Sequence, residues 1–325
     1  MKIKHWRTGF QIFFFILIIY GGFLAVEFLG AEKETVARGT EASVNVVDSS
    51  LPIHSCRYNQ PKPALFEGCG IRYLLDRPLY FKFNRNIWLG ITIPILVILI
   101  FCFLFGRFMC GWMCPLGFTS DIFDSARRKL KISHPKLSQK TIKKVKIFKY
   151  SLLLALIFFS LAVIIPFAHG IYMTKNFFET ACSICPAKLI FPLFGAKLPT
   201  FPTFMNVITS ILSTIGLIFL GIYLAGLAIT RAWCRICPNG AFISLFNKGA
   251  IMNKTKDSLK CTKCGICKRV CPMNNEYVYK EKKLTTISDK ECIMCFKCVE
   301  NCPEKDCLKV KFGNKKIFSS NFKQK

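Results

Sequence analysis

The sequence predicts a membrane α-helical protein with four transmembrane helices and a small cysteine-rich α+β domain at its C-terminal end. Three observations predict this fold class. The chain of 325 residues is 52% hydrophobic and contains four long apolar runs. Its net charge of +28 comes mainly from segments between and after these runs. Its eighteen cysteines fall mostly into closely spaced groups, which packing alone does not explain.

The four apolar runs have the length that a lipid bilayer requires. A helix needs about 20 predominantly apolar residues to cross the hydrocarbon core. The first run follows three basic residues, so a cleaved secretory signal peptide is an alternative, but its length favours a retained helix. We expect the four spans at residues 9–30, 87–105, 151–168 and 206–229.

Lysine and arginine are distributed unequally between the segments that these spans separate. Residues 1–8, 106–150 and 230–325 hold 35 of them, whereas residues 31–86 and 169–205 hold 11. The positive-inside rule therefore predicts a multi-pass protein of the cytoplasmic membrane with both termini in the cytoplasm. Orientation and attraction to anionic lipid explain the basic excess. No nucleic-acid-binding motif accompanies it, so nucleic acid is not an expected partner.

The C-terminal segment contains one cysteine spacing twice. The stretches "CTKCGICKRVCP" and "CIMCFKCVENCP" both read C-x2-C-x2-C-x3-C-P. In this pattern three close thiolates bind one [4Fe–4S] cubane, and the fourth ligand comes from the other run. Zinc is the alternative, but zinc sites favour paired C-x2-C units with a longer spacer. The spacing predicts a first set, Cys261, Cys264, Cys267 and Cys302, and a second set, Cys292, Cys295, Cys298 and Cys271, each holding one cluster.

The two clusters also explain how so short a segment folds. Residues 251–325 are rich in lysine and poor in large apolar side chains, and metal binding supplies the missing core. Thiolates persist best in a reducing compartment, which agrees with a cytoplasmic tail. We therefore expect an N-terminal helix at 1–30, an extracytoplasmic segment at 31–86, a transmembrane module at 87–250 and a two-[4Fe–4S] ferredoxin-like domain at 251–325.

Two further cysteine pairs end apolar runs. The stretches "RFMCGWMCPLG" and "RAWCRICPNG" look like copies of one unit, and each proline can begin a short interfacial helix. Arg107 and Arg231 could hold cluster charge, but the simpler interpretation is that their side chains reach from helix ends toward water. A zinc clip and a redox-active thiol pair are alternatives to a third cluster. Our hypothesis is a third cluster held by an inner set, Cys110, Cys114, Cys234 and Cys237.

The spacing of the remaining cysteines is less specific for a metal site. We expect four outer cysteines on the other side of the membrane, Cys56, Cys69, Cys182 and Cys185. The stretch "ACSICP" repeats the Cys-x2-Cys-Pro spacing and favours a fourth cluster, whereas the compartment favours disulfides, so both stay open. We interpret Cys102 and Cys307 as small buried apolar residues.

Four spans, Cys-Pro motifs at helix ends and a C-terminal double-cubane domain together resemble the membrane polyferredoxins of the NapH and MauN type. The membrane part of the nitrous-oxide reductase regulators is similar. The resemblance covers nearly the whole chain beyond residue 85, and "GRFMCGWMCPLG" and the two ferredoxin motifs are its most specific parts. The chain departs from the commoner Cys-x3-Cys-Pro form at Cys234–Cys237, where one residue is missing.

The resemblance implies an iron–sulfur protein that passes electrons between the membrane quinol pool and another redox protein or reductase subunit. It also implies a quinone as a further cofactor. The sequence contains no Walker A loop, dinucleotide-binding fingerprint, H-E-x-x-H motif or nucleophile elbow, so we expect an electron carrier or quinol-oxidising subunit and no self-contained enzyme. Two alternatives are an assembly factor that reduces a metal centre in another protein and a redox-sensing regulator.

Overall fold

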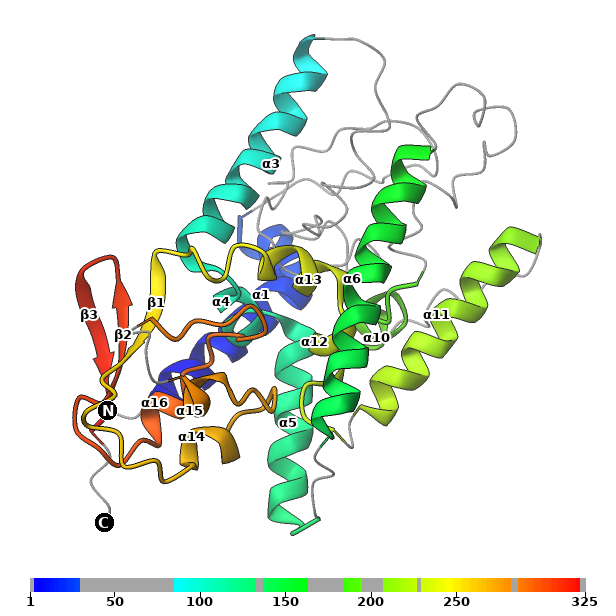
Figure 1. Cartoon of the computed structure of the whole chain (residues 1–325). Coiled ribbons are helices and arrows are strands. Elements are labelled where there is room, and N and C mark those ends of the chain that lie inside the picture. Colours follow the sequence, from blue (N-terminus) through cyan, green and yellow to red (C-terminus); the bar gives the residue numbers. More distant parts are fainter. Residues whose placement is uncertain are drawn as a thin grey trace. The chain divides into compact units, whose positions relative to one another are not determined.

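A computed structural model describes residues 3–29, 85–132, 137–162, 184–194, 207–226, 229–281 and 286–321 (Figure 1). The long helices are α1 (Ile3–Leu29), α3 (Arg85–Phe105), α5 (Pro115–Lys129), α6 (Gln139–Ala162) and α11 (Val207–Ala225). The short helices are α4 (Phe108–Trp112), α10 (Ala187–Phe194), α12 (Ala232–Ile236), α13 (Pro238–Ser244), α14 (Ile266–Arg269), α15 (Tyr277–Lys280) and α16 (Lys297–Glu300). The strands are β1 (Met252–Lys256), β2 (Leu308–Phe312) and β3 (Lys315–Ser319).

The chain divides into two compact units. The cysteine unit comprises residues 1–12, 99–151 and 226–325, and it contains the first, second and inner sets of cysteines. The second unit comprises residues 13–98 and 152–225. The site described below lies entirely within the cysteine unit.

Within the described residues, the four predicted spans lie mainly on the helices α1, α3, α6 and α11. Helix α6 begins at Gln139, well before its predicted span at 151–168. Its first half, "QKTIKKVKIFKY", is rich in lysine and is continuous with the apolar run that follows. No helix in the described ranges has the combination of length and apolarity that crossing a bilayer requires.

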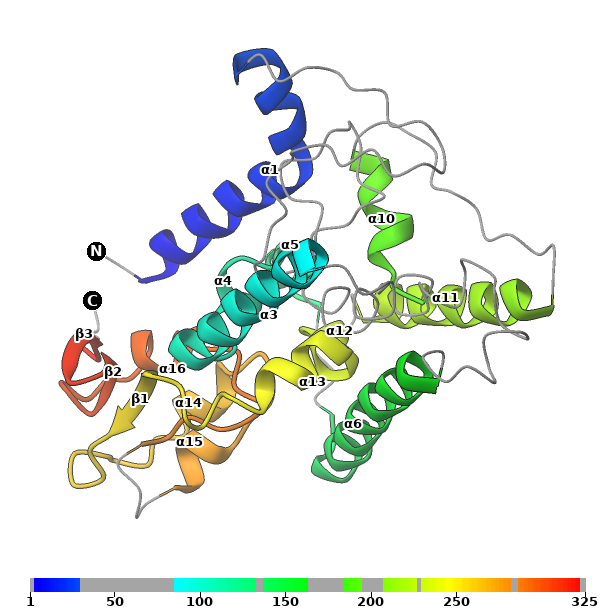
Figure 2. The same ribbon diagram turned by 90° about the horizontal axis from the view of Figure 1, so that it is seen from above.

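The C-terminal domain is α+β, as the sequence predicts. Its sheet is antiparallel with strand order β1-β2-β3, and α16 packs against β2 and β3 (Figure 2). Strand β1 alternates between buried and half-buried residues, so Met252, Lys254 and Lys256 share the buried face. Burial of two lysines on one face of a short strand indicates specific partners beneath it.

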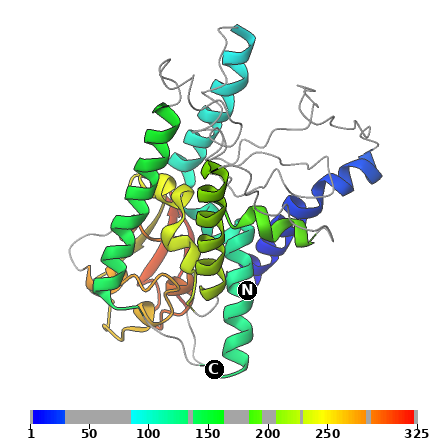
Figure 3. The same ribbon diagram turned by 90° about the vertical axis from the view of Figure 1, so that its right-hand side faces the viewer.

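Each inner Cys-Pro motif starts a helix. Pro115 and Pro238 stand in the first turns of α5 and α13, where a missing N–H costs nothing, as predicted. Cys114 and Cys237 are therefore the N-cap residues of these helices. Figure 3 shows α5 as one continuous helix. The prolines thus fix the second cysteine of each inner pair at the start of a helix.

Helix α4 packs closely against the second ferredoxin motif. The Trp112 indole stacks on Phe108, and its Nε1 donates to the carbonyl oxygen of Met294 at 3.0 Å. Gly111 allows the two backbones to approach, because a Cβ there would overlap the carbonyl oxygen of Ile293 and lie 3.4 Å from Cys295 Cα. The inner and second sets are therefore brought together by backbone contact.

Gly111→Ala is expected to lower the free energy of unfolding by about 1–3 kcal/mol, because the added methyl group forces two backbones apart. The midpoint of denaturant unfolding of the purified holoprotein measures this loss. Gly9→Ala is the matched control. Its Cβ would meet nothing within 4 Å, and alanine in a helix interior is expected to stabilise by about 0.5–1 kcal/mol. Equal effects of the two substitutions would contradict the close approach at Gly111.

Candidate functional site

The first set of cysteines lines a single cavity. Cys261, Cys264 and Cys267 come from the first run, and Cys302 joins them from the second run. The cavity thus brings together the four cysteines that the spacing assigns to one cluster. Cys307 lines the same cavity and is 2% exposed, in agreement with its interpretation as a buried apolar residue.

The second set lines a neighbouring cavity. Cys292, Cys295 and Cys298 face it from the second run, and Cys271 faces it from the first. Cys267 lines this cavity as well as the first one, so the two cavities are adjacent. Each cavity is therefore lined by cysteines of both runs.

The cysteines of the second set fit a metal cluster chemically. Burial raises the pKa of the Cys271 thiol to about 11 and that of Cys298 to about 12, so metal binding must supply the energy for deprotonation. Donors are already in place for the thiolates. The backbone N–H of Asn275 donates to Cys271 Sγ at 3.3 Å, and that of Met294 donates to Cys292 Sγ at 3.4 Å.

The donor set consists of soft thiolates, one of the ligand types that iron–sulfur cubanes use. Soft thiolates select zinc, copper(I) or iron–sulfur clusters. Among the described residues, no three His, Cys, Asp or Glu side chains converge closely enough to hold one metal ion. A cubane needs its four thiolates further apart than a single ion does, because each binds a different corner.

Lys254 is buried beneath the second set. Its ammonium donates to Cys292 Sγ at 3.0 Å, although its side chain extends from a strand with only 2% exposure. Burial alone would lower the pKa of Lys254, but the charges of Cys292 and Cys298 outweigh burial and raise it. Lys254 is therefore a cation at the second site, which the sequence-based prediction missed.

The inner set also comes together. Cys110 and Cys114 are close enough to Cys234 and Cys237 for their thiolates to repel one another. Burial raises the pKa of Cys110 to about 11; the nearby Arg107 opposes this shift, and Cys234 and Cys237 add to it. Four thiols from two sequence repeats thus lie in one buried place, as the hypothesis of a third cluster requires.

Two arginines exchange partners between the repeats. Arg107 Nη2 donates to the carbonyl oxygen of Cys234 at 3.1 Å, and Arg231 Nη1 donates to that of Cys110 at 2.7 Å. Each arginine thus binds the first cysteine of the other repeat. Our interpretation that these side chains reach toward water is wrong, since they are 0% and 1% exposed. Carboxylates that are distant in the sequence hold them in the interior.

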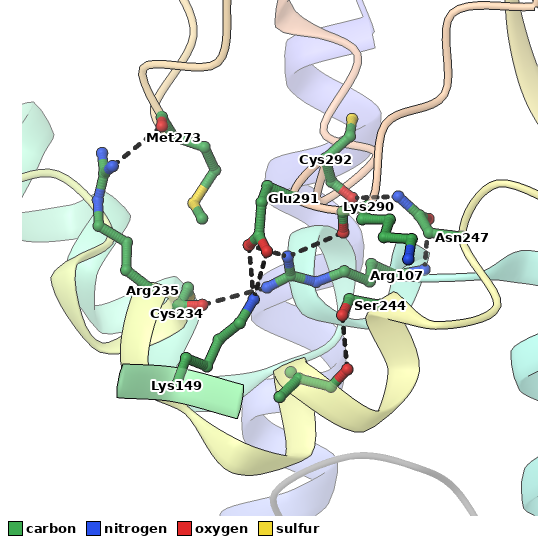
Figure 4. A network of polar contacts seen from close by, with 12 residues as sticks. Arg107, Lys149, Cys234, Arg235, Ser244, Asn247, Met273, Lys290, Glu291 and Cys292 are labelled. Carbon is green, nitrogen blue, oxygen red and sulfur yellow. Dashed lines mark hydrogen bonds and ion pairs between the residues drawn. The ribbon is translucent and has the colours of Figure 1, made fainter. Parts of the chain in front are cut away.

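Glu291 is the carboxylate for Arg107, and it also binds Lys149. Glu291 accepts from Arg107 Nη1 at 3.1 Å and from Lys149 Nζ at 2.6 and 2.7 Å (Figure 4). Both cationic side chains are 0% exposed, whereas the Glu291 side chain is 17% exposed. One carboxylate therefore compensates two buried cations beside Cys292.

Asp121 on α5 is the carboxylate for Arg231, at 2.5 Å from Nη2. Burial opposes ionisation of Asp121, but Arg231 and Lys297 outweigh it, so its pKa lies well below the usual range. Gln11 on α1 donates to Asp121 Oδ2 and to the carbonyl oxygen of Gly111, both at 3.0 Å. The start of α1 is thus attached to the inner set.

The outer cysteines are mostly outside the described residues. Cys56, Cys69 and Cys182 are not among them, and Cys185 lies just before α10, outside the cysteine unit. The choice between a fourth cluster and disulfides therefore stays a prediction.

Two family models match the chain. A 4Fe–4S dicluster domain matches residues 253–303, which contain the first and second sets. A 4Fe–4S binding domain matches residues 86–133 and 212–256, which contain the two halves of the inner set. The chain therefore carries iron–sulfur domains of the ferredoxin type.

Several known proteins are similar over most of this chain. The putative electron transport protein YccM of Escherichia coli is 27% identical, over 66% of this chain and 55% of its own length. The ferredoxin-type protein NapH of Haemophilus influenzae is 26% identical, over 65% of this chain and 64% of its own length. The methylamine utilization ferredoxin-type protein MauN of Methylobacillus flagellatus is 26% identical, over 53% of this chain and 50% of its own length.

A stronger match decides the family. The uncharacterised protein MJ0750 of Methanocaldococcus jannaschii is 30% identical over 227 residues, which are 68% of this chain and 79% of that protein. The chain belongs to the NapH/MauN-type polyferredoxin family. This polyferredoxin also has NosR-like relatives, since the regulatory protein NosR of Pseudomonas aeruginosa is 23% identical over 72% of the chain and 28% of its own length. No solved structure matches the polyferredoxin.

Proposed function

We propose that this polyferredoxin transfers electrons along three [4Fe–4S] clusters held by the first, second and inner sets. One observation carries the proposal. Cys110 and Cys234 of the inner set pack with Cys271 and Cys295 of the second set, together with Met273 and Ile293. Electron tunnelling falls steeply with distance, so contact between ligands of two clusters favours transfer between them.

The surroundings of the inner set favour a cluster over a thiol pair. Cys114, Cys234 and Cys237 are buried, and Cys110 is half-buried. The backbone N–H of Gly240 donates to Cys237 Sγ at 3.3 Å, at the start of α13. Two buried guanidinium groups, on Arg107 and Arg231, interact with the charges of Cys110 and Cys234 and offset the negative charge that a thiolate-ligated cluster brings.

A location in the cytoplasmic membrane is part of the proposal. The four apolar runs and the unequal distribution of basic residues support it. Helices of the chain also expose large apolar side chains, which mark contact with lipid or protein. On α3 and α11 these are Leu96, Leu99, Ile100, Phe103, Ile211, Leu217, Ile218, Ile222 and Leu224.

Quinol is the electron donor we propose for this membrane protein, with another redox protein as the acceptor. A quinol releases two electrons, and clusters in series accept them singly. The printed names of relatives, an electron transport protein and ferredoxin-type proteins, support electron transfer. The similarity to a regulatory protein, NosR, favours redox sensing as the second candidate function.

The iron content of the protein tests the third cluster. We expect about 12 iron atoms per chain after anaerobic purification, and a loss of about 4 when the four inner cysteines are all serine. The control variant changes Cys102, a buried cysteine that lines neither cavity, to serine and is expected to keep all of its iron. About 8 iron atoms in both the parent and the inner-set variant would contradict the proposal. About 16 in the parent would indicate a fourth cluster at the outer cysteines.

A further inference from the structure

We propose that Lys254 raises the reduction potential of the cluster held by the second set, and that this effect is larger than the effect of Lys256 on the cluster held by the first set. The inference rests on the proposed assignment of one [4Fe–4S] cluster to each of these sets. It makes Lys254 a positioning residue that acts on a cluster through a ligand sulfur atom. As a consequence, the lysines of strand β1 affect the reduction potentials of the two clusters unequally, although the two cysteine motifs have the same spacing.

Strand β1 delivers one lysine to each cavity. Lys254 and Lys256 are two residues apart, so they point to the same face of the sheet, and they are 2% and 6% exposed. Lys254 lines the cavity of the second set, whereas Lys256 lines that of the first. The two positions therefore form a natural pair for comparison.

The two ammonium groups have different partners. Lys256 Nζ donates to the carbonyl oxygens of Val278, Tyr279 and Glu281 at 2.9, 3.4 and 2.8 Å. An ammonium group has three N–H donors, so these carbonyl groups use all of them. Lys254 Nζ instead donates to Cys292 Sγ at 3.0 Å.

The backbone of Lys254 is held on both sides. Its N–H donates to Ser288 Oγ at 3.0 Å, and its carbonyl oxygen accepts from the N–H of Ile287 at 2.7 Å. On β2 it pairs with Val310, which is fully buried. These contacts fix the strand position from which the ammonium group reaches the sulfur atom.

A fixed buried cation favours the reduced cluster. Reduction adds one electron to a cluster that four thiolates already make anionic, so a nearby positive charge stabilises the reduced form more than the oxidised form. Net charge and hydrogen bonds to sulfur are the means by which proteins set cluster potentials, and charges interact more strongly where water is excluded. Cys264 of the first set is exposed, so water also stabilises reduction there. Substitution of Lys254 changes the lysine but leaves the exposure of Cys264 unchanged, so it separates the effect of the lysine on the reduction potential from the effect of water.

The position of the second set gives this inequality a function. Its cavity adjoins that of the first set, and its cysteines pack against the inner set. A second cluster that Lys254 makes easier to reduce accepts electrons more readily from either neighbour.

Anaerobic redox titration followed by electron paramagnetic resonance tests the proposal. In Lys254→Met we expect the midpoint potential of one cluster to fall by at least the equivalent of a tenfold change in its one-electron equilibrium, about 59 mV. Lys254→Arg keeps the charge and is expected to restore most of the potential. Lys256→Met is the matched control and is expected to shift each midpoint by less. Unchanged midpoints in Lys254→Met, or an equal shift in Lys256→Met, would overturn the proposal.

Iron counts separate this inference from the proposed function. If Lys254→Met loses about 4 iron atoms, Lys254→Gln, which keeps a donor and removes the charge, takes its place in the titration. An unshifted midpoint in a fully loaded Lys254→Gln would then overturn the inference. A parent with about 8 iron atoms would remove the third cluster but leave the second one available for titration.

Discussion

Glu291→Gln is expected to lower the free energy of unfolding of the holoprotein by about 3–5 kcal/mol, the usual cost of leaving a buried charge without its partner. The structure places the cost near the upper end. Glu291 is the partner of two cations, Arg107 and Lys149, and neither side chain is exposed. The midpoint of denaturant unfolding measures the loss, with cluster absorbance as a second signal.

The defect in Glu291→Gln is expected to shrink as pH rises. Burial and the charge of Arg107 lower the pKa of Lys149 to about 8, although Glu291 opposes this shift, so loss of the carboxylate lowers the pKa further. The unfolded chain keeps the Lys149 proton up to about pH 10.4. Stability rises with pH wherever the unfolded state binds more protons, and in the variant this rise begins at a lower pH. The difference in midpoint between parent and variant should therefore be smaller at pH 9 than at pH 6.

Glu276→Gln is the control for the loss of a carboxylate that binds two lysines. Glu276 binds Lys268 and Lys280, whose side chains are 49% and 67% exposed. Exposed ion pairs contribute little, so we expect little change in the unfolding midpoint. A similar loss of unfolding free energy in both glutamate variants would show that burial of the Glu291 ion pairs does not increase their contribution to stability.

Arg231→Met is expected to destabilise the holoprotein by about 3–5 kcal/mol, because it leaves Asp121 without its main partner in the interior. It also removes the donor to the carbonyl oxygen of Cys110. The loss should therefore appear both in the unfolding midpoint and in a faster release of iron from the inner set.

Lys316→Met is the control for Arg231→Met. Lys316 also binds a carboxylate, Asp306, at 3.3 Å, but the two side chains are 53% and 26% exposed. Exposed ion pairs contribute at most about 1 kcal/mol. If Lys316→Met cost as much as Arg231→Met, the exchange of arginines between the repeats would not explain the stability of the inner set.

The grouping of the ferredoxin cysteines could be predicted because their spacing reflects the geometry of a cubane. Three cysteines in C-x2-C-x2-C place their sulfur atoms around one site, and the fourth must come from elsewhere. The two cavities bring together the same groups of cysteines. The sequence also predicted that the four cysteines of the inner set lie together, because the two Cys-Pro motifs repeat within this single chain.

The roles of the charged residues could not be predicted, because their partners are remote in the sequence. Arg107 and Glu291 are 184 residues apart, so the helix-end position of the arginine gave no sign of its carboxylate. Lys254 resembles an ordinary polar residue in the short strand "MNKTK". Only the packing of that strand over the cysteines shows that its ammonium group faces a sulfur atom.

The span of these contacts bears on the order in which the molecule is made. Arg7 Nη1 donates to the carbonyl oxygen of Cys295 at 2.9 Å, across 288 residues of chain. The ribosome synthesises Arg7, Arg107 and Lys149 long before it synthesises Glu291 and the last cysteine run. Until then these cations must stay hydrated, so the native interior cannot close during synthesis of the first 290 residues. Delivery of iron to the finished tail is therefore the event that we expect to complete the whole cysteine unit.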